Sequence, residues 1–153
     1  MGLKVGRHVV FPFKEALPAA RDLWELASKL ESHQGRRGEA AGHARQDWSG
    51  LAHDAFEKVV KNEETDTATI AGSLRDRARL IADMWSKAYG QENRVLWAED
   101  VNRKIEEDGF FEDVVEWFSG EDDYGDPPPH PAVPQPPEFA KPSVDPDFHP
   151  GGA

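Results

Sequence analysis

Apolar residues recur every three or four positions over most of the first 107 residues, and this spacing is typical of one buried face of an α-helix. One run covers residues 17–30, and a second starts at Ala52 and extends to Ile105. Between them the period breaks at Asp47-Trp48-Ser49-Gly50, where glycine suits a tight reversal. The pattern predicts helices over residues 14–46 and 51–107. We therefore expect an all-α protein whose main part, residues 14–107, is a long antiparallel two-helix hairpin.

Two features weaken the helical pattern locally. Residues 33–43 keep the spacing but contain three glycines, and glycine costs up to ~1 kcal/mol per helical position relative to alanine. This stretch is either a weak helix that a second helix approaches closely or a break in the first helix. Pro18 fits the first helix if it lies in the first turn, where its missing N–H costs nothing. The pattern also leaves open whether the second helix bends near residues 61–72 or at Gly90.

The segments outside the hairpin follow other patterns. Residues 1–13 are expected to form an extended arm that lies on the helices, because a lone strand would have no partner. Residues 108–120 contain apolar pairs at 110–111, 114–115 and 117–118 with acids between them, which predicts a short amphipathic helix that folds back on the end of the second long helix. Ten of the 12 prolines fall in the last 27 residues. This predicts a disordered, proline-rich tail over 121–153 that adds little stability, although parts of it could engage an aromatic groove on a partner.

Composition and charge exclude several classes of function. The net charge is −11, and such a field repels nucleic acid and anionic lipid, so we expect no nucleic-acid partner. There is no cysteine, which excludes disulfides and cysteine-ligated zinc. No stretch approaches the ~20 apolar residues of a membrane-spanning helix, and the apolar run at 9–13 is too short for a cleavable signal peptide. We therefore expect no membrane insertion and no cleavable leader.

Candidate catalytic or metal-binding residues do not form a recognisable pattern. None of the six histidines has a histidine four residues away, and no serine lies in a nucleophile-elbow context. The acidic run at 121–126 lacks the ligand spacing of a calcium loop. We expect a protein that is not an enzyme and that carries no cofactor and no metal.

The turn motif carries a resemblance to a known family. Trp48-Ser49-Gly50, set between two helical stretches and followed by Ala52, Ala55 and Phe56, resembles the WXG100 superfamily of helical hairpins associated with type VII (ESX-like) secretion. The resemblance covers residues 14–107 and implies dimerisation of hairpins into a four-helix bundle, as homo- or heterodimers, and export without a signal peptide. Such a chain would be cytoplasmic before export and secreted or in the cell envelope afterwards. The chain departs from the family in its longer second helix, in its C-terminal extension, and in having no Tyr-x-x-x-Asp/Glu export signal.

The expected function is a non-enzymatic, WXG100-like partner or adaptor for a larger secreted protein of a type VII pathway. The alternatives are a structural or scaffold helical protein with no secretion role, and a toxin-associated module. Because the first helix covers the longer second one only to about residue 83, apolar residues beyond that point would be left for an interface. Besides the turn residues Trp48 and Gly50, the predicted partner-interface residues are Phe56, Trp85, Trp97, Phe110, Phe111, Trp117 and Phe118.

Overall fold

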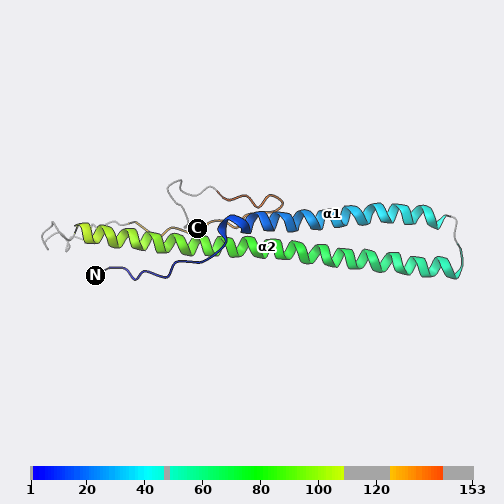
Figure 1. Cartoon of the computed structure of the whole chain (residues 1–153), viewed down its shortest axis with the longest axis horizontal. Coiled ribbons are helices and arrows are strands. Elements are labelled where there is room, and N and C mark those ends of the chain that lie inside the picture. The colour runs from blue at the N-terminus through cyan, green and yellow to red at the C-terminus, as the bar shows by residue number, and fades with distance from the viewer. Residues whose placement is uncertain (1, 47–48, 109–124, 143–153) are drawn as a thin grey trace. The chain divides into compact units, whose positions relative to one another are not determined.

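The computed structural model describes residues 2–46, 49–108 and 125–142. In these ranges it contains two long α-helices and no strand (Figure 1). Helix α1 spans Phe13–Arg45 and α2 spans Leu51–Asp108, with 33 and 58 residues. The expected all-α class with two long helices is confirmed, and each observed helix end differs by at most one residue from its expected position.

The chain divides into two compact units. The hairpin unit consists of Glu15–Asp83 and Pro134–Lys141, and the arm unit consists of Met1–Lys14, Met84–Val133 and Pro142–Ala153. The first part of α2 therefore belongs to the hairpin unit and its second part to the arm unit.

Within the hairpin unit, α1 and the first part of α2 lie side by side and antiparallel (Figure 1). Ion pairs fix the direction. Arg37 pairs with Glu63 at 2.6 Å, and Arg75 on α2 pairs with Glu31, which lies earlier on α1. Gly50 precedes α2 with a φ of 79°, a left-handed conformation that glycine adopts without steric cost.

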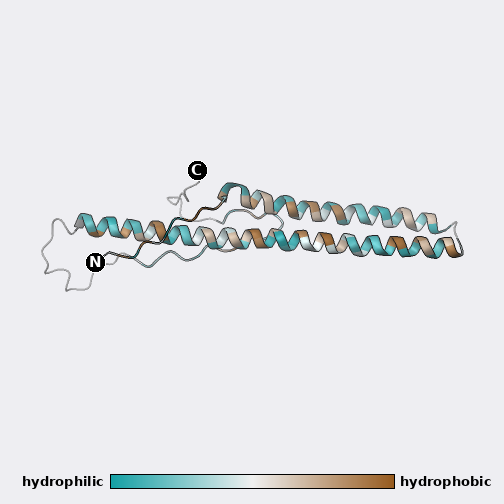
Figure 2. Cartoon of the chain, turned by 60° about the horizontal axis from the view of Figure 1, so that its bottom comes forward, coloured by the Kyte–Doolittle hydropathy of each residue, from teal (hydrophilic) through white to brown (hydrophobic). Residues whose placement is uncertain are grey.

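The surface between the two helices is made largely of alanine, and we call it the alanine seam. Small side chains allow two helix backbones to approach closely. Along both helices apolar residues are interspersed with polar ones (Figure 2). Helix α1 runs without interruption through residues 33–43, so this stretch is helical and the expected alternative of a break is wrong. Helix α2 is likewise one helix through 61–72 and Gly90. The seam consists of Ala20, Ala27, Ala41, Ala71, Ala78 and Ala82, all buried.

Pro18 lies deeper in α1 than we expected. Because α1 begins at Phe13, Pro18 is beyond the first turn, and the prediction for its position is wrong. A proline at this place has no N–H to donate, so the carbonyl of Lys14 lacks the usual helical partner. Burial of the neighbouring Ala16 and Leu17 holds this part of the helix despite that loss.

The proline-rich tail corrects the sequence-based expectation most strongly. We expected all of 121–153 to be disordered, and this is wrong for residues 125–142, which pack on the helices of both units. In the hairpin unit the side chain of Phe139 is fully buried. In the arm unit Ser86 Oγ donates a hydrogen bond to the carbonyl of Pro131 at 2.6 Å. The physical reason is that a few well-placed contacts hold a segment that has no helical or strand periodicity.

Other expectations fall outside the described residues. These are the short helix, of which residues 109–120 are not described, and the tail residues 121–124 and 143–153. The part of the chain that is described contains no third helix.

Candidate interaction surfaces

Four large apolar residues lie along the side of α2 that faces away from the alanine seam, with polar residues such as Asp66, Ser73 and Arg77 between them. At 100° per residue, the four apolar residues fall within an arc of about 100° of the helix surface, whereas the buried positions 60, 71 and 78 lie on the far side. Large apolar side chains left in water along one side of a helix make that side a candidate interaction surface. The outward stripe consists of Leu51, Val59, Ile70 and Leu80, which are 89%, 54%, 53% and 57% exposed.

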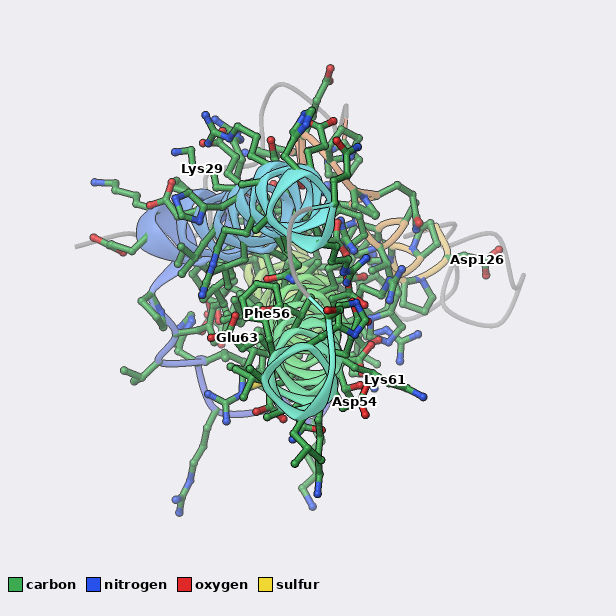
Figure 3. The ribbon with its side chains drawn as sticks, turned by 90° about the vertical axis from the view of Figure 1, so that its right-hand side faces the viewer. Lys29, Asp54, Phe56, Lys61, Glu63 and Asp126 are labelled. Atoms are coloured by element: carbon green, nitrogen blue, oxygen red, sulfur yellow. The ribbon has the colours of Figure 1, made fainter. Side chains whose placement is uncertain are left out.

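Phe56, one of the predicted interface residues, lies at the turn end of the hairpin unit. It is half-buried on the side of α2 that faces α1, while Lys29, Asp54 and Lys61 reach outward (Figure 3). Together with small residues of α1 such as Ala41, Phe56 lines an open groove of about 340 Å³. The small side chains of α1 leave this groove unfilled.

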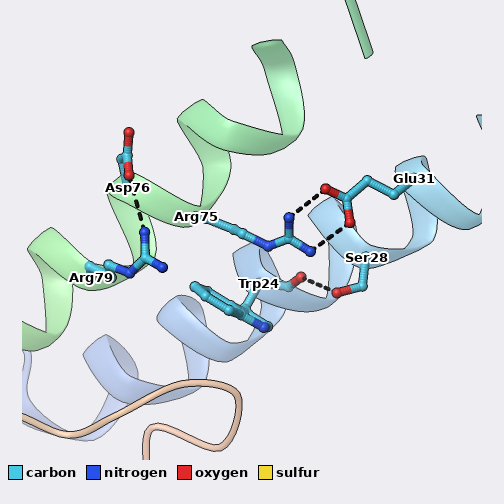
Figure 4. A network of polar contacts seen from close by, with 6 residues as sticks. All are labelled: Trp24, Ser28, Glu31, Arg75, Asp76 and Arg79. Atoms are coloured by element: carbon cyan, nitrogen blue, oxygen red, sulfur yellow. Dashed lines mark hydrogen bonds and ion pairs between the residues drawn. The ribbon is translucent and has the colours of Figure 1, made fainter. Parts of the chain in front are cut away.

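Trp24 on α1 is the centre of a polar and aromatic network in the hairpin unit (Figure 4). The guanidinium carbons of Arg75 and Arg79 lie 5.2 and 5.0 Å from the centre of its ring. Arg75 also forms a two-bond pair with Glu31, whose second bond is 2.6 Å, and the hydrogen bond from Arg75 lowers the pKa of Glu31. Arg79 is held by Asp76 at 3.3 Å. Trp24 is therefore a ring fixed by two cations that are themselves held by carboxylates.

Phe139 completes this cluster from the tail. Its ring meets Trp24 edge to face, with centroids 5.8 Å apart. The N–H of Phe139 donates to the carbonyl of Gln135 at 3.0 Å, which closes a turn, and Arg21 Nε donates to the carbonyl of Glu138 at 2.9 Å. Phe139 has a φ of 44°, a left-handed conformation that costs a side chain roughly 1–2 kcal/mol. The contacts around its ring must therefore offset that cost.

In the arm unit, Trp85 belongs to a ladder of aromatic rings that joins the start of the chain to α2. Trp85 stacks on Tyr89 with centroids 4.8 Å apart, and Tyr89 meets Phe13 edge to face at 6.0 Å. Phe13 in turn contacts Phe11 at 5.1 Å. Trp85 is 2% exposed and Tyr89 is fully buried. Trp85, predicted as an interface residue, is thus packed inside the arm unit.

Trp97 is half-buried and lines a different open cavity. This cavity has a volume of about 300 Å³ and lies between the N-terminal arm and α2, with Leu3, Lys4 and Val95 among its lining residues. The backbone of Leu3 is held nearby, because its N–H donates to Asn102 Oδ1 at 2.6 Å and its carbonyl accepts from Asn102 Nδ2 at 2.9 Å. The arm thus contacts α2 on the same part of the helix as Trp97.

His8 joins the arm to α2 through two carboxylates. Its Nδ1 lies 2.8 Å from Glu92, its Nε2 lies 2.9 Å from Glu99, and the N–H of Val9 donates to the second oxygen of Glu92 at 2.8 Å. Both ring nitrogens therefore face acceptors, which favours the protonated imidazole with two donors. The hydrogen bond with Glu92 and the charge of Glu99 raise the pKa of His8 above its ordinary value of 6.5.

This cluster predicts that docking of the arm depends on pH. Because the pKa of His8 is raised in the folded state, its contribution is fully present below the unfolded value and is lost as pH rises through the raised value. We expect an NMR titration of the full chain to give a His8 midpoint above 6.5, with the amide signal of Val9 moving in the same pH range. Glu99→Gln should lower the midpoint, whereas Glu106→Gln, an exposed acid on the same helix, should not. A midpoint at or below 6.5 would show that His8 is not held between the carboxylates.

The structure describes only some of the remaining predicted residues. Gly50 lies at the turn, as described above, whereas Trp48 lies outside the described residues. So do the four predicted interface residues of segment 108–120. Sequence reasoning did not single out His8, Arg21 or Phe139, because each acts through a contact with a residue far away in the chain. These four predicted residues are Phe110, Phe111, Trp117 and Phe118.

The described part of the chain contains neither a candidate metal site nor a candidate membrane-spanning helix. These ranges hold no group of three or more histidine, aspartate or glutamate side chains arranged to bind a metal ion. Neither α1 nor α2 has a stretch long and apolar enough to cross a membrane.

Comparison with known proteins identifies no relative. No protein-family model, no curated protein and no solved structure matches the chain.

Proposed function

We propose that this chain is a non-enzymatic helical-hairpin protein that binds another protein through the outward stripe of α2. The observation that carries the proposal is the stripe itself, because four large apolar side chains on one side of a helix are more than half exposed. Burial of a Leu or Ile side chain contributes roughly 1.5–3 kcal/mol, which is the driving force that these side chains offer to a helical interface, before the cost of association is subtracted. A helix of the partner that carries a matching apolar face is the surface that fits this stripe.

We further propose that the chain acts as a WXG100-like partner or adaptor for a larger secreted protein of a type VII pathway. Support comes from Trp48-Ser49-Gly50, which lies between α1 and α2, and from the antiparallel direction of the two helices in the hairpin unit. In this proposal the chain is exported by the type VII pathway and forms a homo- or heterodimer of hairpins. The finer form of the fold, a four-helix bundle made by two hairpins, is part of the same proposal.

The proposal is tested by light scattering on the full chain, alone at increasing concentration and mixed with the products of adjacent genes. We expect a dimer or a complex of defined stoichiometry. The double variant Ile70→Glu with Leu80→Glu should weaken it at least about tenfold, because two charges would have to be buried in the interface.

Ala68→Glu is the matched control. Ala68 is an exposed residue of α2 on another side of the helix, so this variant adds a charge outside the stripe and should leave the complex intact. A chain that stays monomeric and captures none of these products contradicts the binding role. If the complex forms but export in the native host does not depend on Trp48, the binding role stands and the secretion role falls.

A further inference from the structure

The Trp24 cluster of the hairpin unit already holds a peptide segment. Residues 134–141 belong to the hairpin unit, although the residues before and after them in the chain belong to the arm unit. The segment Pro134-Gln135-Pro136-Pro137-Glu138-Phe139-Ala140-Lys141 is therefore a short insertion of the tail into a site made by α1 and α2. The contacts that this segment makes show which groups the site recognises.

The site recognises one aromatic side chain and one backbone carbonyl. Phe139 is fully buried against Trp24, and Arg21 donates to the carbonyl of Glu138. The side chain of Glu138 is exposed, so its charge is not what holds the segment. Proline-rich segments suit this mode of binding because little of their conformational freedom is lost when they dock.

The helix residues that form the site are held in place by contacts with one another. Arg75 and Arg79 flank the ring of Trp24, and each is held by its own carboxylate, so the indole is fixed by contacts that do not involve the tail. A binding surface held in place in this way loses little freedom when a ligand arrives. The left-handed backbone at Phe139 points the same way, since such strained residues are found where a segment is clamped as a ligand.

We infer that the Trp24 cluster is a recognition site for a proline-rich segment with a phenylalanine anchor, and that a second copy of this chain can supply the segment. Residues 134–141 of one copy would then occupy the site of another, with Phe139 contributed in trans. The second copy is the occupant to which the structure points, because the segment seated in the site is this chain's own. Tethering favours the internal segment by raising its effective concentration, so exchange becomes visible when the internal anchor is removed.

The test uses two complementary variants of the full chain. Phe139→Ala keeps the site and removes the anchor, and Arg21→Ala with Trp24→Ala keeps the anchor and damages the site. We expect a mixture of the two variants to associate at least about tenfold more tightly than either variant with itself, because only the mixture combines an empty site with an available anchor. Fluorescence energy transfer between labelled variants measures the difference.

A labelled synthetic peptide of residues 134–141 provides a second measurement. It should bind the Phe139→Ala chain, and the same peptide carrying Phe139→Ala should bind at least about tenfold more weakly. The Arg21→Ala chain gives a site variant that keeps the Trp24 side chain, in case the double variant does not fold. Equal association in all mixtures, together with no difference between the two peptides, would overturn the inference.

The result is independent of the proposed function. Association through the outward stripe would be the same for every mixture of these variants, because none of them changes the stripe. Conversely, Ile70→Glu with Leu80→Glu leaves the Trp24 cluster unchanged. Failure of one proposal therefore leaves the other open to its own test.

Discussion

Replacing Trp85 by alanine is expected to lower the free energy of unfolding by about 3–5 kcal/mol, the cost of truncating a core aromatic side chain. Trp85 is 2% exposed and stacks on Tyr89, which is itself fully buried and contacts Phe13. The variant leaves a cavity next to Tyr89 and removes one ring of the ladder that joins the start of α1 to α2. Urea denaturation of the full chain, followed by circular dichroism, measures the change.

Met84→Ala is the matched control for this variant. Met84 is the neighbouring large apolar residue of α2, but it is 48% exposed, so its truncation should cost much less than that of Trp85. If the two variants unfold at the same urea concentration, the aromatic ladder is not part of the core of the arm unit.

Phe139→Ala is expected to lower the melting temperature of the full chain by ~6–12 °C, which corresponds to a loss of about 3 kcal/mol. The loss has an upper limit, because a tail segment that has lost its anchor can detach while the helices stay folded. Deleting residues 134–153 should therefore lower the melting temperature by a similar amount. Differential scanning calorimetry of the two variants compares these effects directly.

Glu138→Ala separates the anchor from the rest of the segment. Its side chain is exposed, and the carbonyl that accepts from Arg21 is kept, so this variant should melt like the natural chain. A Phe139→Ala chain that also melts like the natural one would mean that the tail adds little stability, as the sequence alone led us to expect.

The two helices could be predicted from the sequence because their signals are local. Leu17, Ala20 and Ala27 recur at helical spacing and are buried in the structure, and the pattern stops at the residues where the helices end. Gly50, at the break in period, has the positive φ that a reversal can require. The glycines at 35, 38 and 42 were ambiguous, because propensity alone does not reveal that a second helix packs against the neighbouring Ala41.

The docked tail could not be predicted because its signal is not local. Phe139 is a single aromatic residue among prolines, so it has neither a period of two nor a period of 3.6, and its partner Trp24 is 115 positions earlier in the chain. The composition of a segment measures how much apolar surface it has. It does not reveal that a single side chain has a binding site elsewhere in the chain. The same holds for His8, whose partners Glu92 and Glu99 lie more than 80 positions away.

The interface that we propose uses different residues from those predicted from the sequence. Aromatic side chains were chosen for their size, yet Trp85 is used inside the arm unit. The aliphatic residues of the outward stripe, such as Val59 and Ile70, were counted as part of the same apolar pattern as the buried residues. Separating the two requires knowledge of which side of α2 meets α1, and that depends on pairing between residues distant in the chain.

The alanine seam has a consequence for how this protein can change in evolution. Where two backbones approach over alanine, away from the groove at Ala41, a larger side chain must push the helices apart, whereas a smaller one costs little more than helix propensity. The seam therefore limits how large its side chains can be, whereas smaller side chains are tolerated. The outward stripe has no such limit, since its residues are not packed against α1. Substitutions there can adapt the molecule to a new binding partner without repacking the hairpin, so the two sides of one helix are free to evolve at different rates.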